Sequence, residues 1–259
     1  MTICRLCLVG TLQFWSFVLQ FFTHNQFKAV ILIVMTTLAS HPFVVTAKTY
    51  TMGAFVFPPL SMQKEGTTEC YGPAIDITRR IIESAGHELD VLCAPASRIY
   101  KMMAQGKVDF TINIKSTQLL KPHTTFIEPR FTTIKLQLFE YDLDMPKIVS
   151  GIRGFDYLGY RGKLINEGYQ FSDLATSDES ITVFIKQRTK ALLTYDMLIN
   201  TYIKSYLDNK LPSSINAKDI ITIGSHYGVS NHSPAHKEVI KILSDYAAEY
   251  DVTEFTDDI

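Results

Sequence analysis

A loop suited to holding an anion occupies residues 151–157. Arg153 and Gly154 lie at a turn that leads from an expected strand into a helix. Free backbone N–H groups at the start of a helix favour an anion, and a glycine lets the backbone approach a ligand closely. Phe155 and Tyr157 follow in the same loop and are suited to walling a cleft. We therefore expect this loop to contact a ligand.

A carboxylate stands at the start of a later helical pattern. Asp196 directly follows the apolar run at residues 191–195. Aspartate is a favourable helix N-cap, and ligands of α/β folds bind where strand ends and helix starts meet. The residues leave both roles open for Asp196. Asp76 and Asp109 are interpreted as structural acids.

Other residue types argue against metal and catalytic chemistry. His226, His232 and His236 have no short two-ligand spacing with a carboxylate, so no metal and no other cofactor is expected. The chain has no Gly-x-Ser-x-Gly elbow that would support Ser-His-Asp catalysis. These residues therefore predict neither a metal site nor a serine-hydrolase site.

Strand and helix patterns alternate along the chain and would position these groups. Short apolar or β-branched runs predict strands, and apolar residues at helical spacing predict helices. Their alternation indicates parallel pairing and an α/β fold. The expected strands are residues 49–56, 87–93, 108–114, 131–141, 147–152, 170–171 and onward, 191–195, 219–225 and 227–230, and the expected helices are residues 74–84, 97–105 with Ser97 as the N-cap, 157–168, 178–188, 197–207 and 234–250.

The first 47 residues differ from the rest of the chain. They contain no Asp or Glu. Lys28, the apolar run at residues 29–38 and the small residues ending at Ala47 are typical of a cleavable secretory signal peptide. The prediction is export, with cleavage near Ala47. An uncleaved anchor at residues 6–22, or a start site further downstream, are the alternatives.

Composition sets the remaining limits. Hydrophobic residues make up 46% of the chain and charged residues 20%, as in ordinary globular proteins. The net charge of −1 provides no basic surface for nucleic acid. Cys70 and Cys93 follow the leader, and in an oxidising compartment they form either one disulfide or two separate thiols.

Four short segments together resemble the family 3 extracellular solute-binding proteins. They are the loop Phe57-Pro58-Pro59, the helix start from Gly72 to Asp76, the segment Gln105-Gly106-Lys107-Val108-Asp109, and Glu128-Pro129-Arg130-Phe131, which stands where the family has Asp-Pro-Tyr. The resemblance covers nearly all of the chain after the leader. It implies a two-lobed type II periplasmic-binding-protein fold, each lobe a mixed sheet flanked by helices, joined by two crossover strands. The implied lobes are residues 48–138 plus 226–259 and residues 139–225.

The resemblance also implies a ligand site between the lobes. It implies stacking by Phe57, carboxylate contacts from the segment after the third strand, a positive charge at the start of the second helix, anion contacts in the second lobe, and an ammonium contact from Asp196. The implied residues are Phe57, Arg98, Asn113, Lys115, Ser116, Arg153, Gly154, Phe155 and Asp196. Counting back from Glu128, the family's carboxylate-binding arginine position falls on Leu120. Lys115 is then a candidate for the missing charge, with Lys121 and Arg130 as weaker substitutes.

The family implies a monomeric, non-enzymatic receptor in the periplasm that delivers a small polar solute, an amino acid or similar zwitterion, to the permease of an ABC importer. One alternative is a sensory or accessory binding module that acts on a membrane receptor. A second is a periplasmic dehydratase-like enzyme on the same fold, with Glu128 or Asp196 as its acid or base.

Overall fold

A computed structural model describes residues 46–208 and 210–257 of the chain. The predicted signal peptide falls on residues 1–47 and so lies almost entirely outside the described part. The described residues from Ala47 onward form one compact unit. No helix in the described part is both long and apolar enough to cross a membrane.

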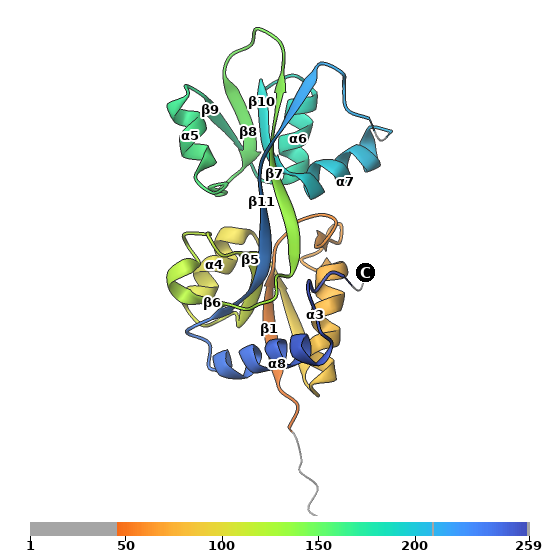
Figure 1. The fold of residues 1–259 in the computed structure, drawn as a ribbon, viewed down its shortest axis with the longest axis vertical. Coiled ribbons are helices and arrows are strands. Elements are labelled where there is room, and N and C mark those ends of the chain that lie inside the picture. Colours follow the sequence, from red (N-terminus) through yellow and green to blue (C-terminus); the bar gives the residue numbers. More distant parts are fainter. Residues whose placement is uncertain (1–45, 209, 258–259) are drawn as a thin grey trace, which may run out of the picture. The chain divides into compact units, whose positions relative to one another are not determined.

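Strands and helices alternate through this unit (Figure 1). The strands are β1 (Thr49–Ala54), β2 (Met62–Gln63), β3 (Cys70–Tyr71), β4 (Glu88–Cys93), β5 (Phe110–Ile114), β6 (Thr124–Phe126), β7 (Thr132–Tyr141), β8 (Ile148–Ile152), β9 (Gln170–Leu174), β10 (Ala191–Tyr195) and β11 (Ile215–Ser230). The helices are α3 (Pro73–Ser84), α4 (Ala96–Ala104), η1 (Lys121–His123), α5 (Tyr160–Asn166), α6 (Ser177–Ile185), α7 (Asp196–Tyr206) and α8 (His236–Glu249).

The first lobe is built on the strand order β4-β1-β5-β11. β4, β1 and β5 are parallel, and β11 runs antiparallel to β5. Helices α3 and α8 pack here because their apolar faces are buried, with Ile81, Ile82 and Leu243 fully enclosed. These residues share one core with Phe110 and Tyr227.

The second lobe continues the same sheet as β7-β10-β8-β9. β10, β8 and β9 are parallel, and β7 runs antiparallel to β10. Its core contains Leu136, Phe184 and Leu193 among its fully buried residues. Helix α6 carries a capping box in which the Thr176 hydroxyl accepts from the Glu179 N–H, so the sequence specifies where this helix begins.

The long strands β7 and β11 connect the two lobes. They pair antiparallel from Ile215 opposite Tyr141 to Ser225 opposite Thr132, with a register shift between Asp219 and Ile221. Figure 1 shows both strands running from one group of helices to the other. The two-lobed α/β architecture with two crossover strands is therefore the one that the sequence predicted.

Three local expectations were wrong. The two short strands expected at 219–225 and 227–230 are one continuous strand, β11. Ser97 does not cap α4, because that helix begins at Ala96 with Pro95 at the N-cap position. The helix expected from residue 157 begins at Tyr160, because Tyr157 and Leu158 adopt left-handed backbone angles, with φ of 52° and 60°.

A disulfide links Cys70 at the start of β3 to Cys93 at the end of β4, with their Cα atoms 5.2 Å apart. The sequence had left open the choice between a bridge and two thiols. The bridge ties β3, the short strand before α3, to β4, the edge strand of the first lobe.

Candidate functional site

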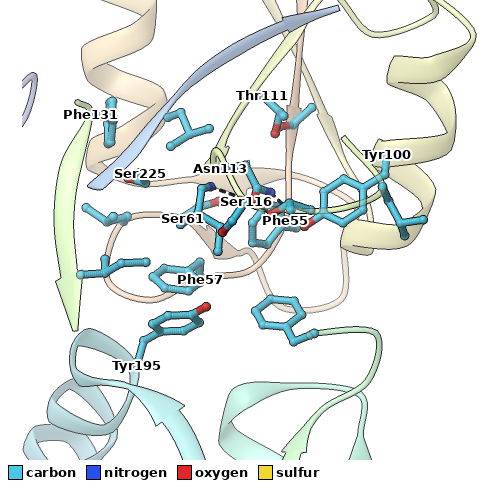
Figure 2. Close-up of a pocket in the computed structure, with 18 of the residues that line it drawn as sticks. Phe55, Phe57, Ser61, Tyr100, Thr111, Asn113, Ser116, Phe131, Tyr195 and Ser225 are labelled. Atoms are coloured by element: carbon cyan, nitrogen blue, oxygen red, sulfur yellow. Dashed lines mark hydrogen bonds between the residues drawn. The ribbon is translucent and has the colours of Figure 1, made fainter. Parts of the chain in front are cut away.

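A cavity of about 150 Å³ lies where the two lobes meet (Figure 2). Residues around β1, β5 and α4 line it from the first lobe. The loop after β8 and the end of β10 line it from the second lobe. Clefts between lobes are common places for small-molecule sites, so this cavity is the candidate functional site.

Five aromatic rings form a closed belt in the wall of the cavity: Phe55, Phe57, Tyr195, Tyr157 and Phe155. Around the belt, neighbouring ring centroids are 6.3, 5.8, 6.0, 5.7 and 6.3 Å apart. Two of these contacts, Phe57 with Tyr195 and Phe55 with Phe155, join the first lobe to the second. Figure 2 shows the Phe57 ring lying next to the Tyr195 ring.

The ends of parallel strands position this belt. Phe55 and Phe57 follow β1, Tyr195 is the last residue of β10, and Phe155 and Tyr157 follow β8. The Tyr157 hydroxyl accepts a hydrogen bond from the Ile152 N–H at 2.6 Å. This bond holds the left-handed turn at Tyr157 in place, and burial raises the pKa of Tyr157.

Asn113 organises the polar side of the cavity. Its Nδ2 donates to the Tyr100 hydroxyl at 2.9 Å, and its Oδ1 accepts from the Ile114 N–H at 2.9 Å and the Thr117 hydroxyl at 2.7 Å. Burial raises the pKa of Tyr100 to about 12, partly offset by the hydrogen bond from Asn113. Tyr100 therefore stays protonated at neutral pH, with its proton available to a ligand acceptor.

Two serine hydroxyls in the cavity wall are buried without a hydrogen-bond partner. They are the Oγ atoms of Ser61 and Ser116. A buried polar group without a partner costs free energy. A ligand with a polar atom at this end of the cavity would remove that cost.

The structure divides the predicted site residues by charge. The uncharged ones, Phe57, Asn113, Ser116, Gly154 and Phe155, line the cavity. The charged ones are not among the lining residues; these are Arg98, Lys115, Arg153 and Asp196. Ligand contact by any of the nine stays a prediction.

Local partners engage three of the charged residues. Lys115 is exposed and forms an ion pair with Glu128. The hydrogen bond from Lys115 is the largest factor that lowers the Glu128 pKa. Arg153 is exposed, and its Nη2 donates to the Asp173 carbonyl at 3.4 Å. The Asp196 Oδ1 accepts from the Lys135 and Met197 N–H groups, each at 2.9 Å, and so ties α7 to β7.

Arg98 is exposed on α4. Leu120, the position equated with the family's arginine, is fully buried beside Ile99, Tyr100 and Met103 in a small core cluster. Gln118 and Leu119 face the cavity instead. The count back from Glu128 thus identified Leu120, a core position that lies two residues after the polar, cavity-lining Gln118.

The cavity wall carries little charge. Among the described lining residues there is no Lys, Arg or His. The acidic residue among them is Asp156, which is exposed, and its Oδ2 accepts from the Gly159 N–H at 2.8 Å. The wall is therefore mainly apolar and aromatic, with a few polar groups, and lacks a cation for a carboxylate.

Several lining residues were missed by the sequence analysis: Phe55, Ser61, Tyr100, Gln118, Asp156 and Tyr195. Phe55 stands two residues before Phe57, a spacing that places side chains of an extended segment on one face. Tyr195 ends a strand directly before Asp196. The expectation that ligands of α/β folds bind at strand ends therefore applied to Tyr195 as well.

In the described part of the chain, no group of three or more His, Cys, Asp or Glu residues is arranged to hold a metal ion. His226 and His236 have backbone partners, with their Nδ1 atoms 3.1 Å from the Ile127 carbonyl and 2.9 Å from the Ser230 carbonyl. His232 Nε2 lies 3.1 Å from His123 Nδ1.

Comparison with known proteins identifies the architecture. No protein-family model and no curated protein matches the sequence. Solved structures do match. An ancestral arginine-binding protein bound to arginine has 14% identity and a TM-score of 0.64 over 78% of this chain and 92% of that one. The GluR0 ligand-binding core from Nostoc punctiforme with L-glutamate has 16% identity and a TM-score of 0.60 over 78% and 94%.

A histidine kinase sensor domain with similarity to periplasmic binding proteins also matches. It has 15% identity and a TM-score of 0.62 over 80% of this chain and 90% of that one. At these identities the likeness shows a shared fold and nothing finer. The chain has the type II periplasmic-binding-protein fold.

Proposed function

We propose that this protein is a receptor that captures a small ligand between its two lobes. The observation that carries the proposal is the aromatic belt, because two of its contacts join residues of different lobes around one cavity. A ligand in that cavity touches both lobes and favours the closed form over any open one. Only such a difference in affinity can report occupancy to a partner.

The proposed lobes are residues 48–138 plus 226–259 and residues 139–225, with β7 and β11 as the connections. The register shift between Asp219 and Ile221 lies in this pair of strands, where a local twist is easily accommodated. The proposed location is the periplasm, which agrees with the disulfide between Cys70 and Cys93.

The proposed partner is the permease of an ABC importer, which would recognise the closed form. The rival partner is a membrane receptor. The likeness to a histidine kinase sensor domain favours keeping this second candidate. Uptake of a bound, labelled ligand in cells with and without the gene separates the two, because a pure sensor leaves initial uptake rates unchanged.

The enzyme alternative has no support in the placement of its carboxylates. Glu128 forms an ion pair with Lys115, and Asp196 accepts two backbone N–H groups. Neither is among the residues that line the cavity. A catalytic acid or base must reach the reacting atoms, so a binding role fits the geometry better.

The direct test is a thermal-shift screen of residues 48–259 against amino acids, polyamines, organic acids and small aromatic compounds. A ligand at 100 times its dissociation constant adds about 2.7 kcal/mol to the free energy of unfolding. Small-angle scattering with the best ligand should show a more compact particle. The absence of any stabilising compound would argue against a receptor role.

A further inference from the structure

We propose that the cavity binds an uncharged ligand with a single aromatic ring and a hydroxyl or amide group, and not an α-amino acid. This inference rests on the proposed receptor function and specifies its ligand class. It departs from the zwitterion that the family resemblance implies. Three independent features of the cavity wall carry it.

The first feature is the distribution of charge. A carboxylate taken out of water needs a cation or several strong donors. Lys115 is held in an ion pair with Glu128, and Arg98 and Arg153 are exposed outside the described cavity wall. Asp156 at the edge of the cavity would repel an anionic ligand. The site therefore disfavours ligands that carry a carboxylate.

The second feature is the position of Asp196, the expected partner of a ligand's ammonium group. The Asp196 Oδ1 accepts the N–H groups of Lys135 and Met197. Tyr195, the residue directly before it, lies in the cavity wall, whereas Asp196 is not among the lining residues. Lys115, the candidate partner of an amino acid's carboxylate, and Asp196, the candidate partner of its ammonium group, are thus both outside the cavity wall.

The third feature is the size and lining of the cavity. A volume of about 150 Å³ suits one six-membered ring, since an apolar cavity of that size binds benzene. The belt around Phe57 and Tyr195 offers edges and faces for stacking. The unpartnered hydroxyls of Ser61 and Ser116 and the proton of Tyr100 can satisfy a neutral polar group.

The test compares four ligands that share a 4-hydroxyphenyl ring and differ in charge. They are tyrosol (neutral), tyramine (cationic), 4-hydroxyphenylacetate (anionic) and tyrosine (zwitterionic). Isothermal titration calorimetry of residues 48–259 should give tyrosol a dissociation constant at least tenfold lower than those of tyrosine and 4-hydroxyphenylacetate. A panel of neutral single-ring alcohols and amides, and the twenty amino acids, would be measured in parallel.

A matched pair of neighbouring variants locates the binding. Ser116→Ala removes an unpartnered hydroxyl from the cavity wall and should weaken tyrosol about fivefold or more. Lys115→Met changes the adjacent exposed residue and should leave the constant unchanged. Far-ultraviolet circular dichroism and urea midpoints confirm that both variants are folded.

Each outcome decides the matter. Tighter binding of tyrosine or any other amino acid than of every neutral compound overturns the inference and leaves the receptor function standing. Tyramine binding tenfold tighter than tyrosol also overturns it, and would identify Asp156 as a counter-charge. If no compound of either panel binds, the inference fails, and the broader thermal-shift screen with polyamines and organic acids decides the receptor function.

Discussion

The rings of Phe57 and Tyr195 meet across the lobe boundary with their centroids 5.8 Å apart and their planes inclined at 52°. Phe57 follows the first strand, and Tyr195 ends the tenth. Phe57 packs against both hydrophobic cores, whereas Tyr195 belongs to the second. The pair therefore connects the two cores at the wall of the cavity, and it is the first place to test the proposed function.

Tyr195→Ala should weaken both ligand binding and stability. It removes two contacts of the belt and leaves a hole beside Tyr157. The expected losses are at least tenfold in affinity and about 3 kcal/mol in the free energy of unfolding, as for other buried large-to-small changes. Calorimetry and urea denaturation measure them.

Tyr195→Phe is the matched control, because it keeps the ring. No hydrogen bond of the Tyr195 hydroxyl occurs within the described part of the chain, so stability should stay close to wild type. Tyr206→Ala, on the exposed end of α7, should change neither quantity much. An unchanged affinity in Tyr195→Ala would remove the belt from the binding site.

Lys115→Met should leave ligand affinity unchanged and alter stability by no more than about 1 kcal/mol, because its ion pair with Glu128 is exposed. The measurable effect of this variant is on the pKa of Glu128. The hydrogen bond from Lys115 holds the Glu128 pKa below its usual value, so the variant should raise it. Nuclear magnetic resonance titration of the Glu128 carboxyl carbon follows this change. Loss of affinity instead would return Lys115 to the site.

The charged residues illustrate what the sequence could not reveal. Charge and strand-end position together favoured Lys115 and Asp196 as ligand contacts. Lys115 pairs with Glu128, 13 residues away, and Asp196 accepts the N–H of Lys135, 61 residues away, in addition to that of its neighbour Met197. A strand-end charge binds whichever group the fold brings near. That choice is made by tertiary packing and leaves no local pattern.

Hydrophobic periodicity predicted strands more reliably than charge predicted ligand contacts, where a single core determines which residues of the strand are buried. The strand expected at residues 191–195 is β10, which is buried along its whole length. In β11 the prediction omitted residues 215–218, in the mostly exposed first half, and broke the strand at His226, within the buried second half. It pairs with β7 in one lobe and with β5 in the other. A strand that passes between two environments has no single hydrophobic period.

Reduction of the Cys70–Cys93 bridge should lower the free energy of unfolding by about 3 kcal/mol. The bond spans a sequence separation of 23 residues, and this is the entropy cost expected for a loop of that length. Urea denaturation with and without dithiothreitol measures the difference. A Cys70→Ser/Cys93→Ser variant should match the reduced protein and be insensitive to the reductant. Equal midpoints in all four samples would contradict the bridge as a stabilising link.

Glu254→Gln should lower stability by about 2 kcal/mol near neutral pH, in the range for hydrogen bonds to a charged group. Burial alone would raise the Glu254 pKa, but hydrogen bonds from Arg130 and Thr133 outweigh it and hold the pKa at about 2. The carboxylate fastens the segment of Phe255, which packs on Phe131 and Tyr227.

The pH dependence has a definite sign. A carboxyl whose folded pKa is about 2, against an ordinary value of 4.5, stabilises the protein above pH 4.5. That contribution disappears as the pH falls from 4.5 to 2. The wild type should therefore lose stability more steeply than Glu254→Gln over this window in urea midpoints. Parallel curves would show that Glu254 is not the group responsible.

Gln118→Arg should change the charge preference of the cavity, because Gln118 is an exposed residue of its wall. An arginine there can reach a carboxylate with a bidentate pair. The ratio of the 4-hydroxyphenylacetate and tyrosol dissociation constants, measured by calorimetry, should fall by tenfold or more.

Leu120→Arg is the informative contrast. It places a charge in the fully buried cluster of Ile99 and Met103, so it should unfold or strongly destabilise the protein without any gain in anion binding. If Leu120→Arg folds and binds the anion while Gln118→Arg does not, the cavity-facing assignment of this segment is wrong.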